Sequence, residues 1–429
     1  MTQVPAPSYY RASATPYAPY APLAGSAHAR VAVIGGGYAG LNTALGLAER
    51  GVGEVVLLER DQVGFGASGR NGGFVFAGYS LGEQALLDQL GASRAAGLFR
   101  LTHEAVQRIR QRIANYTIAC DVVDQGVIWA NWFRDPAVLR QRQQLLAEHY
   151  GEQWQWLEVD ELRQQVRTRR YHGGLYERDA LHLHPLNYAI GLAAAAAAQG
   201  VVIHEQSAAI ELRREGTQWR ISTPHGELHA DQVVLACGGY LAGLYKPVDR
   251  SVMPIATYVM TTEPLHERLD DCLRTRAAIY DSRFAFDYYR ALPDTRLLWG
   301  GRISICDRSP RTVQRLLRAD MLRVFPQLQG VKVDYAWSGL MSYARHQMPQ
   351  IGGDGQGLWW AQAFGGHGLA PTCAAGELLA AAIAEGDDRW MQFADYGLAS
   401  THRPLGYLAA QATYWWQQGR DRVKSGLEG

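Results

Sequence analysis

The stretch that decides the fold is RVAVIGGGYAGL, residues 30–41. Val31 to Ile34 is a short apolar run, typical of a strand buried on both faces of a parallel sheet. The glycine-rich turn 35–40 follows it, and residues 41–50 carry apolar side chains at helical spacing until Gly51 ends the helix. A strand, a glycine-rich turn and a helix in this order predict a dinucleotide-binding βαβ unit.

The glycines of the turn have separate physical roles. Gly35 permits the tight turn, Gly37 lets the backbone approach a diphosphate, and Gly40 lets the helix pack closely on the strand. We expect the diphosphate at the helix N-terminus, beside Tyr38 and Ala39, where unpaired N–H groups and the helix dipole favour an anion.

A second apolar run, 55–58, ends in Glu59, which stands 19 positions after Gly40. A carboxylate at this place accepts hydrogen bonds from ribose hydroxyls and repels a 2′-phosphate, which disfavours NADP. Arg60 extends from it toward the expected adenine side. The alternative is a glycine-rich turn with a surface glutamate, and the ordered context argues against it. The turn by itself does not separate FAD from NAD.

Composition and charge exclude several classes of protein. The chain has 429 residues, 47% hydrophobic and 19% charged, with a net charge of +1. These values fit a folded protein of two domains and argue against nucleic-acid binding. The five cysteines have no CxxC spacing, which favours free thiols in a reducing compartment. No apolar run approaches about 18 residues and no signal peptide is recognisable, so we expect a cytoplasmic monomer or small homo-oligomer without a membrane span.

Further motifs resemble one family of flavoproteins. Residues 64–74 read GFGASGRNGGF, residues 287–290 DYYR, residues 297–302 LLWGGR and residues 364–370 FGGHGLA. With the turn at 35–40 and the segment Ser8-Tyr9-Tyr10, they make the chain similar to the D-amino-acid oxidase-like FAD superfamily. Within it, the chain looks most like the gamma-glutamylputrescine oxidoreductase branch. These motifs are more specific for the superfamily than for the substrate.

The resemblance implies FAD bound lengthwise, with residues 64–74 along its diphosphate and flavin. Ser68 offers a hydroxyl, and the Arg70 guanidinium can form a bidentate bond to a phosphate or to the ring system. The alternative is a surface loop with a solvated arginine. The other residues expected to border the cofactor are Gly66, Ala67, Asn71, Gly72, Gly73, Ala209, Cys237, Gly238 and Gly339.

The turn Gly365-Gly366-His367-Gly368, with Leu369, precedes a helix expected over Pro371 to Glu385. The resemblance places the N-terminus of this helix at the flavin N1 and C2 carbonyl. A helix dipole and free amides there stabilise the negative charge that reduction brings. His367 is expected beside the flavin, either in proton transfer or only as a packing or capping residue.

Covalent attachment of FAD is not expected. Some amine-oxidising relatives use a cysteine in the region that here reads Leu340-Met341-Ser342-Tyr343, which has none. Cys373 falls inside the last helix, and no histidine replaces Arg70. We therefore predict noncovalent FAD.

The order of elements predicts an α/β fold, α+β overall, with a Rossmann-like FAD-binding domain interleaved with an antiparallel-sheet substrate domain. Residues 1–29 are expected to be an irregular arm, and 401–429 a C-terminal helix. The FAD-binding domain is expected to take 30–85, 175–250 and 335–400. The substrate domain is expected to take 86–174 and 251–334, with a hairpin turn at 293–295.

The reaction that the resemblance implies is oxidation of an amine C–N bond. A neutral amine gives hydride to flavin N5, the imine hydrolyses to an aldehyde or keto acid, and O2 reoxidises the flavin to give H2O2. Positioning and amine deprotonation suffice without a strong side-chain base. The expected substrate is a small-molecule amine such as gamma-glutamylputrescine. The alternatives are an amino-acid dehydrogenase that passes electrons to a quinone or partner protein, and an FAD-holding subunit of a multi-protein complex.

Aromatic residues of the expected antiparallel sheet should roof the flavin. Strand alternation puts Phe286 and Tyr288 on one face, with Asp287 and Tyr289 on the other. The candidate catalytic residues are His367, Tyr289 and Arg302, and the candidate substrate contacts are Phe74, Tyr258, Phe286, Tyr288, Trp299, Trp337 and Tyr343. Arg302 either holds a carboxylate by a two-point bond or forms a surface or interdomain salt bridge.

Two further sequence patterns are weaker evidence of function. His182-x-His184 has the spacing of metal ligands along a strand, but no third ligand accompanies the pair, so we expect no metal. Residues 405–423 have an amphipathic pattern that favours a docked helix over a membrane anchor.

Overall fold

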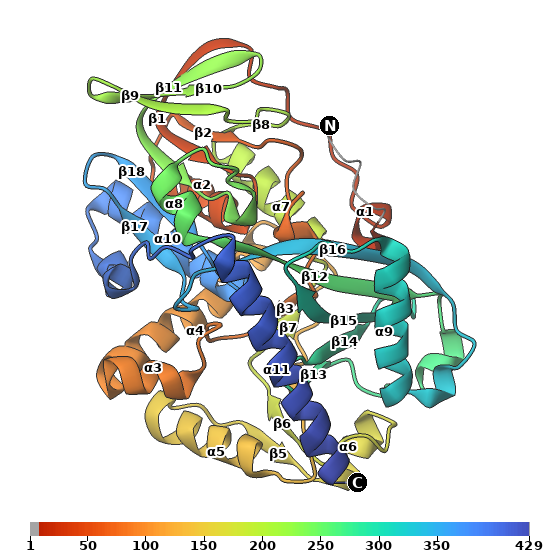
Figure 1. Ribbon diagram of the computed structural model, residues 1–429. Coiled ribbons are helices and arrows are strands. Elements are labelled where there is room, and N and C mark those ends of the chain that lie inside the picture. Colours follow the sequence, from red (N-terminus) through yellow and green to blue (C-terminus); the bar gives the residue numbers. More distant parts are fainter. Residues whose placement is uncertain (1–7, 429) are drawn as a thin grey trace.

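The computed structural model describes residues 8–428. Within this range the chain builds two eight-stranded sheets and a two-stranded ladder. The first sheet, in the upper half of Figure 1, has the order β17-β18-β11-β1-β2-β8, with β10 and β9 paired beside β11. Its strands are β1 Gly25–Ile34, β2 Val55–Leu58, β8 Val202–His204, β9 Glu211–Glu215, β10 Gln218–Ser222, β11 Gly226–Leu235, β17 Gln350–Gly353 and β18 Leu358–Gln362.

The centre of this sheet is parallel, as the apolar runs predict. β1 pairs in parallel with β2 and β11, and β11 with β18. Both faces are covered. Val31 and Val33 belong to the large core under the helices, whereas Ala32 and Ile34 belong to a separate core with residues of β10 and β11. Residues 31–34 of the strand are therefore buried on both faces, which is why this part of the sequence does not alternate.

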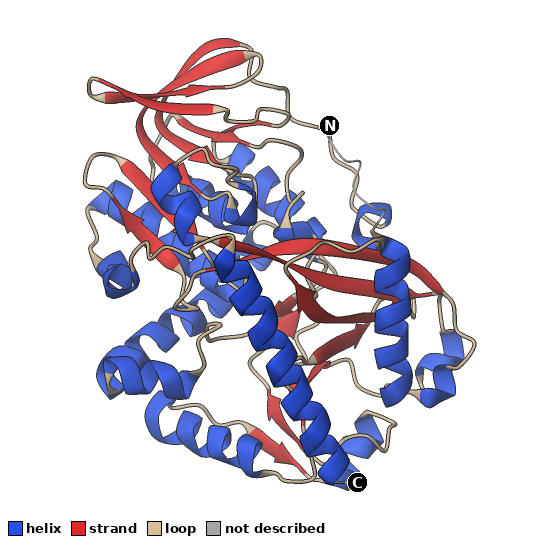
Figure 2. Cartoon of the chain, viewed as in Figure 1, coloured by secondary structure: helices blue, strands red, loops and turns tan. Residues whose placement is uncertain are grey.

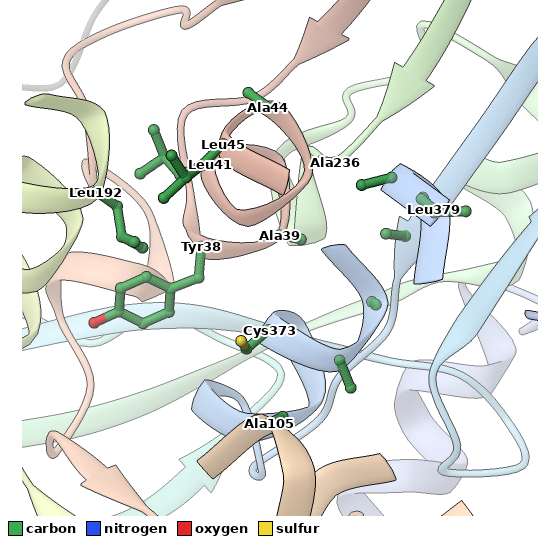
Figure 3. Close-up of a cluster of buried hydrophobic side chains, with 14 of the residues drawn as sticks. Tyr38, Ala39, Leu41, Ala44, Leu45, Ala105, Leu192, Ala236, Cys373 and Leu379 are labelled. Atoms are coloured by element: carbon green, nitrogen blue, oxygen red, sulfur yellow. The ribbon is translucent and has the colours of Figure 1, made fainter. Parts of the chain in front are cut away.

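Three helices cover one face of the first sheet. They are α2 Tyr38–Glu49, α7 Pro185–Ala198 and α10 Leu369–Glu385. Figure 3 shows α2 end-on, with Leu41 and Leu45 pointing toward Leu192 of α7, and with Leu379 of α10 on the opposite side of α2. Gly376 of α10 meets Asn42 of α2, and a Cβ there would lie 2.5 Å from the Asn42 Cβ. Close helix packing thus joins the two ends of the chain under one sheet.

The second sheet lies lower in Figure 1 and has the order β16-β12-β15-β14-β13-β4-β6-β5. All its neighbours are antiparallel except β13 and β4. The helix α9, Pro310–Val324, packs on this sheet (Figure 2). The strands are β4 Val127–Ala130, β5 Gln155–Leu157, β6 Gly174–Glu177, β12 Met253–Thr262, β13 Ala278–Asp281, β14 Asp287–Ala291, β15 Leu297–Ser304 and β16 Val333–Tyr343.

The hairpin predicted around 293–295 is present, because β14 and β15 pair across it. Two segments lie elsewhere than the domain boundaries suggest. Most of β16 falls in 335–400 and most of β6 in 175–250, yet both strands pair inside the second sheet. Their partners, β12 and β4, are distant in sequence, and local composition carries no signal for such pairing.

The N-terminal segment corrects the expectation of an irregular arm. The helix α1, Tyr9–Ala12, is capped by the Ser8 hydroxyl, and β1 begins at Gly25 rather than at Arg30. The early start comes from pairing with β11, in which Gly25 faces Gly226. Tyr10 is fully buried. The prolines at positions 5 and 7 lie outside the described residues.

The remaining helices and strands connect the two sheets. The helical region over 83–115 is divided into two helices at Gly91, whose φ is +75°. The segment 136–150 is α-helical only to Leu145 and continues as one π-helical turn, Leu146–Tyr150. These elements are α3 Glu83–Leu90, α4 Ala92–Asn115, α5 Ala137–Leu145, α6 Val159–Gln165 and α8 Lys246–Ser251, together with the ladder strands β3 Phe74–Val75 and β7 Leu181–His182.

The C-terminal helix α11, Leu405–Leu427, crosses the front of the molecule in Figure 1. Gln411 and Tyr414 are buried on its inner side, and their side chains accept hydrogen bonds from Ile305 N at 3.1 Å and Ile303 N at 3.3 Å. The helix is therefore docked, as its amphipathic pattern predicts. Across residues 8–428, no helix is long and apolar enough to cross a membrane.

Candidate functional site

A cavity of about 1510 Å³ runs between the two sheets. Ile34, Leu58 and Ala236, at the carboxyl ends of β1, β2 and β11, form its floor. This is where open α/β sheets bind ligands. Drug-sized ligands occupy about 300–1,000 Å³, so the volume suits a dinucleotide together with a substrate.

The first glycine turn forms one end of this cavity. Gly35 has a φ of +116°, and a Cβ there would lie 2.5 Å from the Ala236 carbonyl oxygen. A Cβ on Gly40 would lie 1.9 Å from the Gly35 carbonyl oxygen. Gly40 itself does not line the cavity; it brings α2 close to the turn. Gly37, Tyr38 and Ala39 do line it, at the N-terminus of α2.

Glu59 holds the turn as well as facing the cavity. Its Oε2 accepts a hydrogen bond from Gly36 N at 2.7 Å, and its Oε1 accepts one from Asp61 N at 2.8 Å. Burial raises the pKa of Glu59 to about 7, against the effect of these two amides. Arg60 pairs with Asp61 at 2.8 Å and lies over the Tyr240 ring. A ribose hydroxyl therefore meets an acid that is already oriented by the backbone.

The loop 64–74 folds back on α2. Ser68 Oγ accepts a hydrogen bond from Tyr38 N at 2.9 Å, at the N-terminus where an anion is expected. Asn71 closes the loop, since its Nδ2 donates to Ser68 O at 2.8 Å and its Oδ1 accepts from Gly73 N at 2.8 Å. Arg70 donates to Phe65 O at 2.9 Å and to Ser338 O at 3.1 Å, which ties the loop to β16.

The second glycine turn, 365–368, forms the other end of the cavity. Gly366 N donates to Ser80 Oγ at 2.9 Å, and Gly365 N donates to Ser342 O at 2.7 Å. The helix α10 starts at Leu369, two residues before the predicted Pro371. The His367 ring lies 4.8 Å from the Phe76 ring, edge to face, and burial lowers the pKa of His367 to about 4. His367 is therefore neutral at pH 7.

Most predicted residues gather around this one cavity. Its lining includes Gly35, Gly37, Tyr38, Ala39, Glu59, Arg60, Gly66, Ala67, Ser68, Arg70, Asn71, Gly72, Ala209, Cys237, Gly238, Gly339, Gly365, Gly366, His367, Gly368, Leu369, Phe74, Phe286, Tyr288, Tyr343 and Arg302. Phe286 and Tyr288 face it together, while Asp287 and Tyr289 are buried on the other side of β14, as alternation predicts.

Four aromatic candidates lie outside the lining. Tyr289 and Trp299 stack on each other in the core under the second sheet, with ring centres 4.4 Å apart, so Tyr289 is not placed to be catalytic. Tyr258 is buried and donates to Cys306 O at 2.7 Å. Trp337 donates from Nε1 to Arg70 O at 3.0 Å and so supports the cofactor loop. Gly73 also lies behind the lining, where a Cβ would meet Leu183 O at 2.1 Å.

Arg302 corrects another expectation. Its Nε and Nη2 bind the two oxygens of Asp320, at 2.5 and 2.9 Å, and Asp320 is 3% exposed. The two-point bond predicted for a substrate carboxylate is thus made within the protein, between β15 and α9. The salt-bridge interpretation of Arg302 is the one that the geometry supports.

Sequence reasoning missed the far wall of the cavity. Its residues are Phe76, Ser80, Trp129, Arg142 and Tyr280, and Tyr240, beside Arg60 at the opposite end, was missed as well. The rings of Phe76, Tyr280 and Trp129 lie parallel in series, 5.8 Å and 6.0 Å apart. They come from three distant segments, and a lone aromatic in each segment gives no local signal. Within residues 8–428, no group of three or more His, Cys, Asp or Glu side chains is arranged to hold a metal ion.

A long cavity with glycine cradles at both ends, at the carboxyl edge of a parallel sheet, defines a dinucleotide-binding flavoprotein of the two-sheet type. The model for the family "FAD dependent oxidoreductase" (DAO) matches residues 30–382. The chain belongs to this family and is an FAD-dependent oxidoreductase. The residues described above fit FAD, because Gly37, Tyr38 and Ala39 at the N-terminus of α2 line the same cavity as Glu59, and the volume of this cavity exceeds what a diphosphate alone requires.

Relatives agree with this assignment. The chain is 37% identical over 390 residues to gamma-glutamylputrescine oxidoreductase of Escherichia coli (strain K12), covering 90% of this chain and 91% of that protein. It is 34% identical to the probable oxidoreductase OrdL of Haemophilus influenzae, with 89% of each chain covered. The crystal structure of glycine oxidase from Geobacillus kaustophilus superposes with a TM-score of 0.71 at 21% identity, over 87% of this chain and 99% of that one, which shows the shared fold.

Proposed function

We propose that this protein oxidises the C–N bond of a gamma-glutamylated polyamine, with gamma-glutamylputrescine as the first candidate. The 37% identity to the E. coli enzyme over nine-tenths of both chains carries this proposal. The cavity supports it, because an aromatic channel continues beyond the second glycine turn and suits an extended aliphatic substrate.

Bound FAD would supply the acceptor for a hydride from the carbon next to the amine nitrogen, and reoxidation by O2 would give H2O2. The cavity residues described above would hold the cofactor without a covalent bond. Leu340, Met341 and Ser342 line the cavity where relatives of the covalent kind carry a cysteine, and Cys373 is buried inside α10 outside the lining.

The protein's own part in the chemistry is to surround the reacting amine with buried side chains that are uncharged at pH 7. Burial raises the pKa of Tyr280 and of Tyr343 to about 12 and lowers that of His367 to about 4, so these groups are uncharged at pH 7. An ammonium ion entering such a wall is desolvated, which lowers its pKa and favours the free amine needed for oxidation. The proton leaves to solvent, and no side-chain base is required.

The test is anaerobic mixing of the FAD-loaded protein with gamma-glutamylputrescine, while the visible absorbance of the flavin is followed. We expect the flavin to be reduced within the time of one catalytic turnover, and H2O2 to form when oxygen is admitted. Putrescine without the glutamyl group is the matched substrate control. Failure of every amine in a broad panel to reduce the flavin would contradict the proposal. Reduction that only an artificial dye reverses would favour the dehydrogenase alternative.

A further inference from the structure

An ion pair stands on the far wall of the cavity and has no role in holding the cofactor. Arg142 of α5 lines the cavity, and its Nη2 lies 2.6 Å from Oε1 of Glu83 at the start of α3. The two side chains are 19% and 10% exposed, and only Arg142 belongs to the lining, so Arg142 is the member of the pair that a ligand in the cavity can reach. Arg142 is therefore positioned to meet a charged ligand.

Arg142 has donors that the protein does not use fully. Its Nε is buried without a hydrogen-bond partner among residues 8–428. Its Nη1 lies 3.4 Å from the Tyr280 hydroxyl, longer than the usual range of about 2.7–3.2 Å for such bonds. The guanidinium is held in place by the rings of Trp129 and Trp154, 4.7 and 4.9 Å away. A fixed guanidinium with spare donors is a good receptor for a carboxylate.

A second acid, Glu177 of β6, is also buried near Arg142, and its Oε2 has no hydrogen-bond partner within the described chain. Burial raises the pKa of Glu177 to about 8, against the favourable charge of Arg142, so Glu177 is mostly uncharged at pH 7. Arg142 and Glu83 then balance each other, and a ligand that brought only a carboxylate would add an unbalanced negative charge. A ligand that brings a carboxylate and an ammonium together leaves the local charge balanced.

From this arrangement we infer that Arg142 binds the α-carboxylate of the substrate's amino-acid head group, while Glu83, behind the lining, holds Arg142 in position. The inference rests on the proposed function, because it assigns the glutamyl end of the same substrate. The aliphatic linker then lies along the rings of Tyr280 and Phe76, toward His367. Those rings are 5.8 Å apart, and the Phe76 and His367 rings 4.8 Å. An extended chain covers about 3.5 Å for every three bonds, so a linker of several methylenes spans this interval.

Other arginines of the cavity are already engaged. Arg283 pairs with Asp281 and Asp287, and Arg302 with Asp320. Arg70 is bonded to two backbone carbonyls beside the cofactor loop. Arg345 lines the cavity but is exposed. Arg345 is therefore the rival for the carboxylate, and the experiment includes it.

The experiment pairs protein variants with ligand analogues. Arg142→Met, Arg142→Lys and Arg345→Met are each assayed with gamma-glutamylputrescine and with its analogue lacking the α-carboxylate. A charge-assisted hydrogen bond contributes about 1.5–3 kcal/mol, so we expect Arg142→Met to raise KM for the parent roughly 10- to 100-fold with kcat within a few-fold. With the decarboxylated analogue, wild type and Arg142→Met should have similar KM values. Arg142→Lys should restore part of the affinity.

Glu83 is tested in the same way. Because Glu83 acts through Arg142, Glu83→Gln should raise KM for the parent less than Arg142→Met does, and should leave KM for the analogue lacking the α-carboxylate unchanged. The double variant Glu83→Gln/Arg142→Met removes both charges and leaves no buried ion unpaired, so its melting temperature separates loss of folding from loss of recognition. Equal effects of Arg142→Met on parent and analogue, or the whole effect at Arg345→Met, would overturn the inference.

A ligand that cannot be oxidised separates this inference from the proposed function. The gamma-glutamyl amide of butylamine has the head group and linker but no terminal amine. We expect it to perturb the flavin spectrum of wild type and to bind at least tenfold more weakly to Arg142→Met. Binding that depends on Arg142, without oxidation of any amine, would reject the proposed function alone. Oxidation of gamma-glutamylputrescine with no dependence on Arg142 would reject the inference alone.

Discussion

The Nε of Arg290 donates a hydrogen bond to the carbonyl oxygen of Gly72 at 2.7 Å. The same buried side chain donates to Leu183 O at 2.8 Å and to the Tyr10 hydroxyl at 3.2 Å. One residue of β14 thus joins the cofactor loop, the start of α7 and the N-terminal helix. The position of Gly72 in the cavity depends on a contact 218 residues away in sequence.

Replacing Arg290 with Met should loosen this loop. It leaves the carbonyl oxygens of Gly72 and Leu183 without this donor, which costs about 1–3 kcal/mol for each unpaired buried group, and part of that should appear as weaker FAD binding. The measurement is FAD affinity by fluorescence together with the melting temperature of the apoprotein. Arg311→Met, on the exposed surface of α9, is the control. Unchanged FAD affinity in Arg290→Met would show that the loop holds its shape alone.

Gly37→Ala tests the cofactor cradle. The new Cβ would lie 2.9 Å from Ser68 Oγ, whose side chain is able to move. We therefore expect a folded protein that binds FAD at least tenfold more weakly than wild type, because the methyl group occupies the approach to the α2 N-terminus. Ser68→Ala alone and the double variant are the controls. If the double variant binds FAD as well as Ser68→Ala does, the cradle does not contact the cofactor.

Arg302 should matter for stability rather than for substrate binding. Arg302→Met leaves Asp320 buried without its bidentate partner, which we expect to lower the free energy of unfolding by about 3–5 kcal/mol. Arg302→Met with Asp320→Leu removes both charges and should recover most of that loss. KM for the amine should stay within a few-fold of wild type in the double variant. A large rise in KM in the double variant would indicate that Arg302 contacts the substrate.

His367 should not act as a proton donor near neutral pH. Because burial lowers its pKa to about 4, it is neutral between pH 6 and 8. His367→Gln should then lower kcat/KM by less than about tenfold and leave the shape of the pH profile in this range unchanged. General acid–base catalysis contributes about 10²–10⁴-fold, so a loss of that size, with a changed profile, would assign a proton-transfer role to His367.

His184 should make the protein sensitive to acid. Its Nδ1 accepts a hydrogen bond from Asn187 N and caps α7, and burial lowers the pKa of His184 to about 4. The unfolded chain takes up the proton near pH 6.5, so the free energy of unfolding falls as pH drops from about 6.5 to about 4, by on the order of 1–3 kcal/mol. The stabilisation is complete above about pH 6.5.

His184→Asn keeps a good capping side chain and removes the titration. We expect it to reduce the loss of stability between pH 6.5 and 4, measured by chemical denaturation. His402→Asn, on an exposed residue, is the control and should leave the slope as it is in wild type. An unchanged slope in His184→Asn would mean that the acid sensitivity comes from elsewhere, with His182 as the next candidate, since its pKa is lowered by burial to about 3.

Local sequence predicts the elements whose cause is local. The turn at Gly35 requires a positive φ, the buried part of β1 requires an apolar run, and α10 requires an alanine-rich stretch. Each of these requirements is met by residues that are adjacent in the sequence. The ends of helices and strands were predicted less accurately. At Gly25 the strand begins where it pairs with β11, and at Gly91 a single backbone angle separates two helices. Alternation correctly placed Phe286 and Tyr288 on the cavity face, since strand geometry alone determines which side chains share a face.

The sequence by itself determined the glycine turn from Gly35 to Gly40 and the acid Glu59 beside it, because φ angles, helix N-terminal amides and a strand-end carboxylate are properties of short segments. Only the tertiary structure decided that Arg302 pairs with Asp320 and that Arg142 meets Glu83 on the cavity wall. A charged side chain in a sequence has many possible partners. Burial selects one of them, because a charge removed from water is stable only beside its complement.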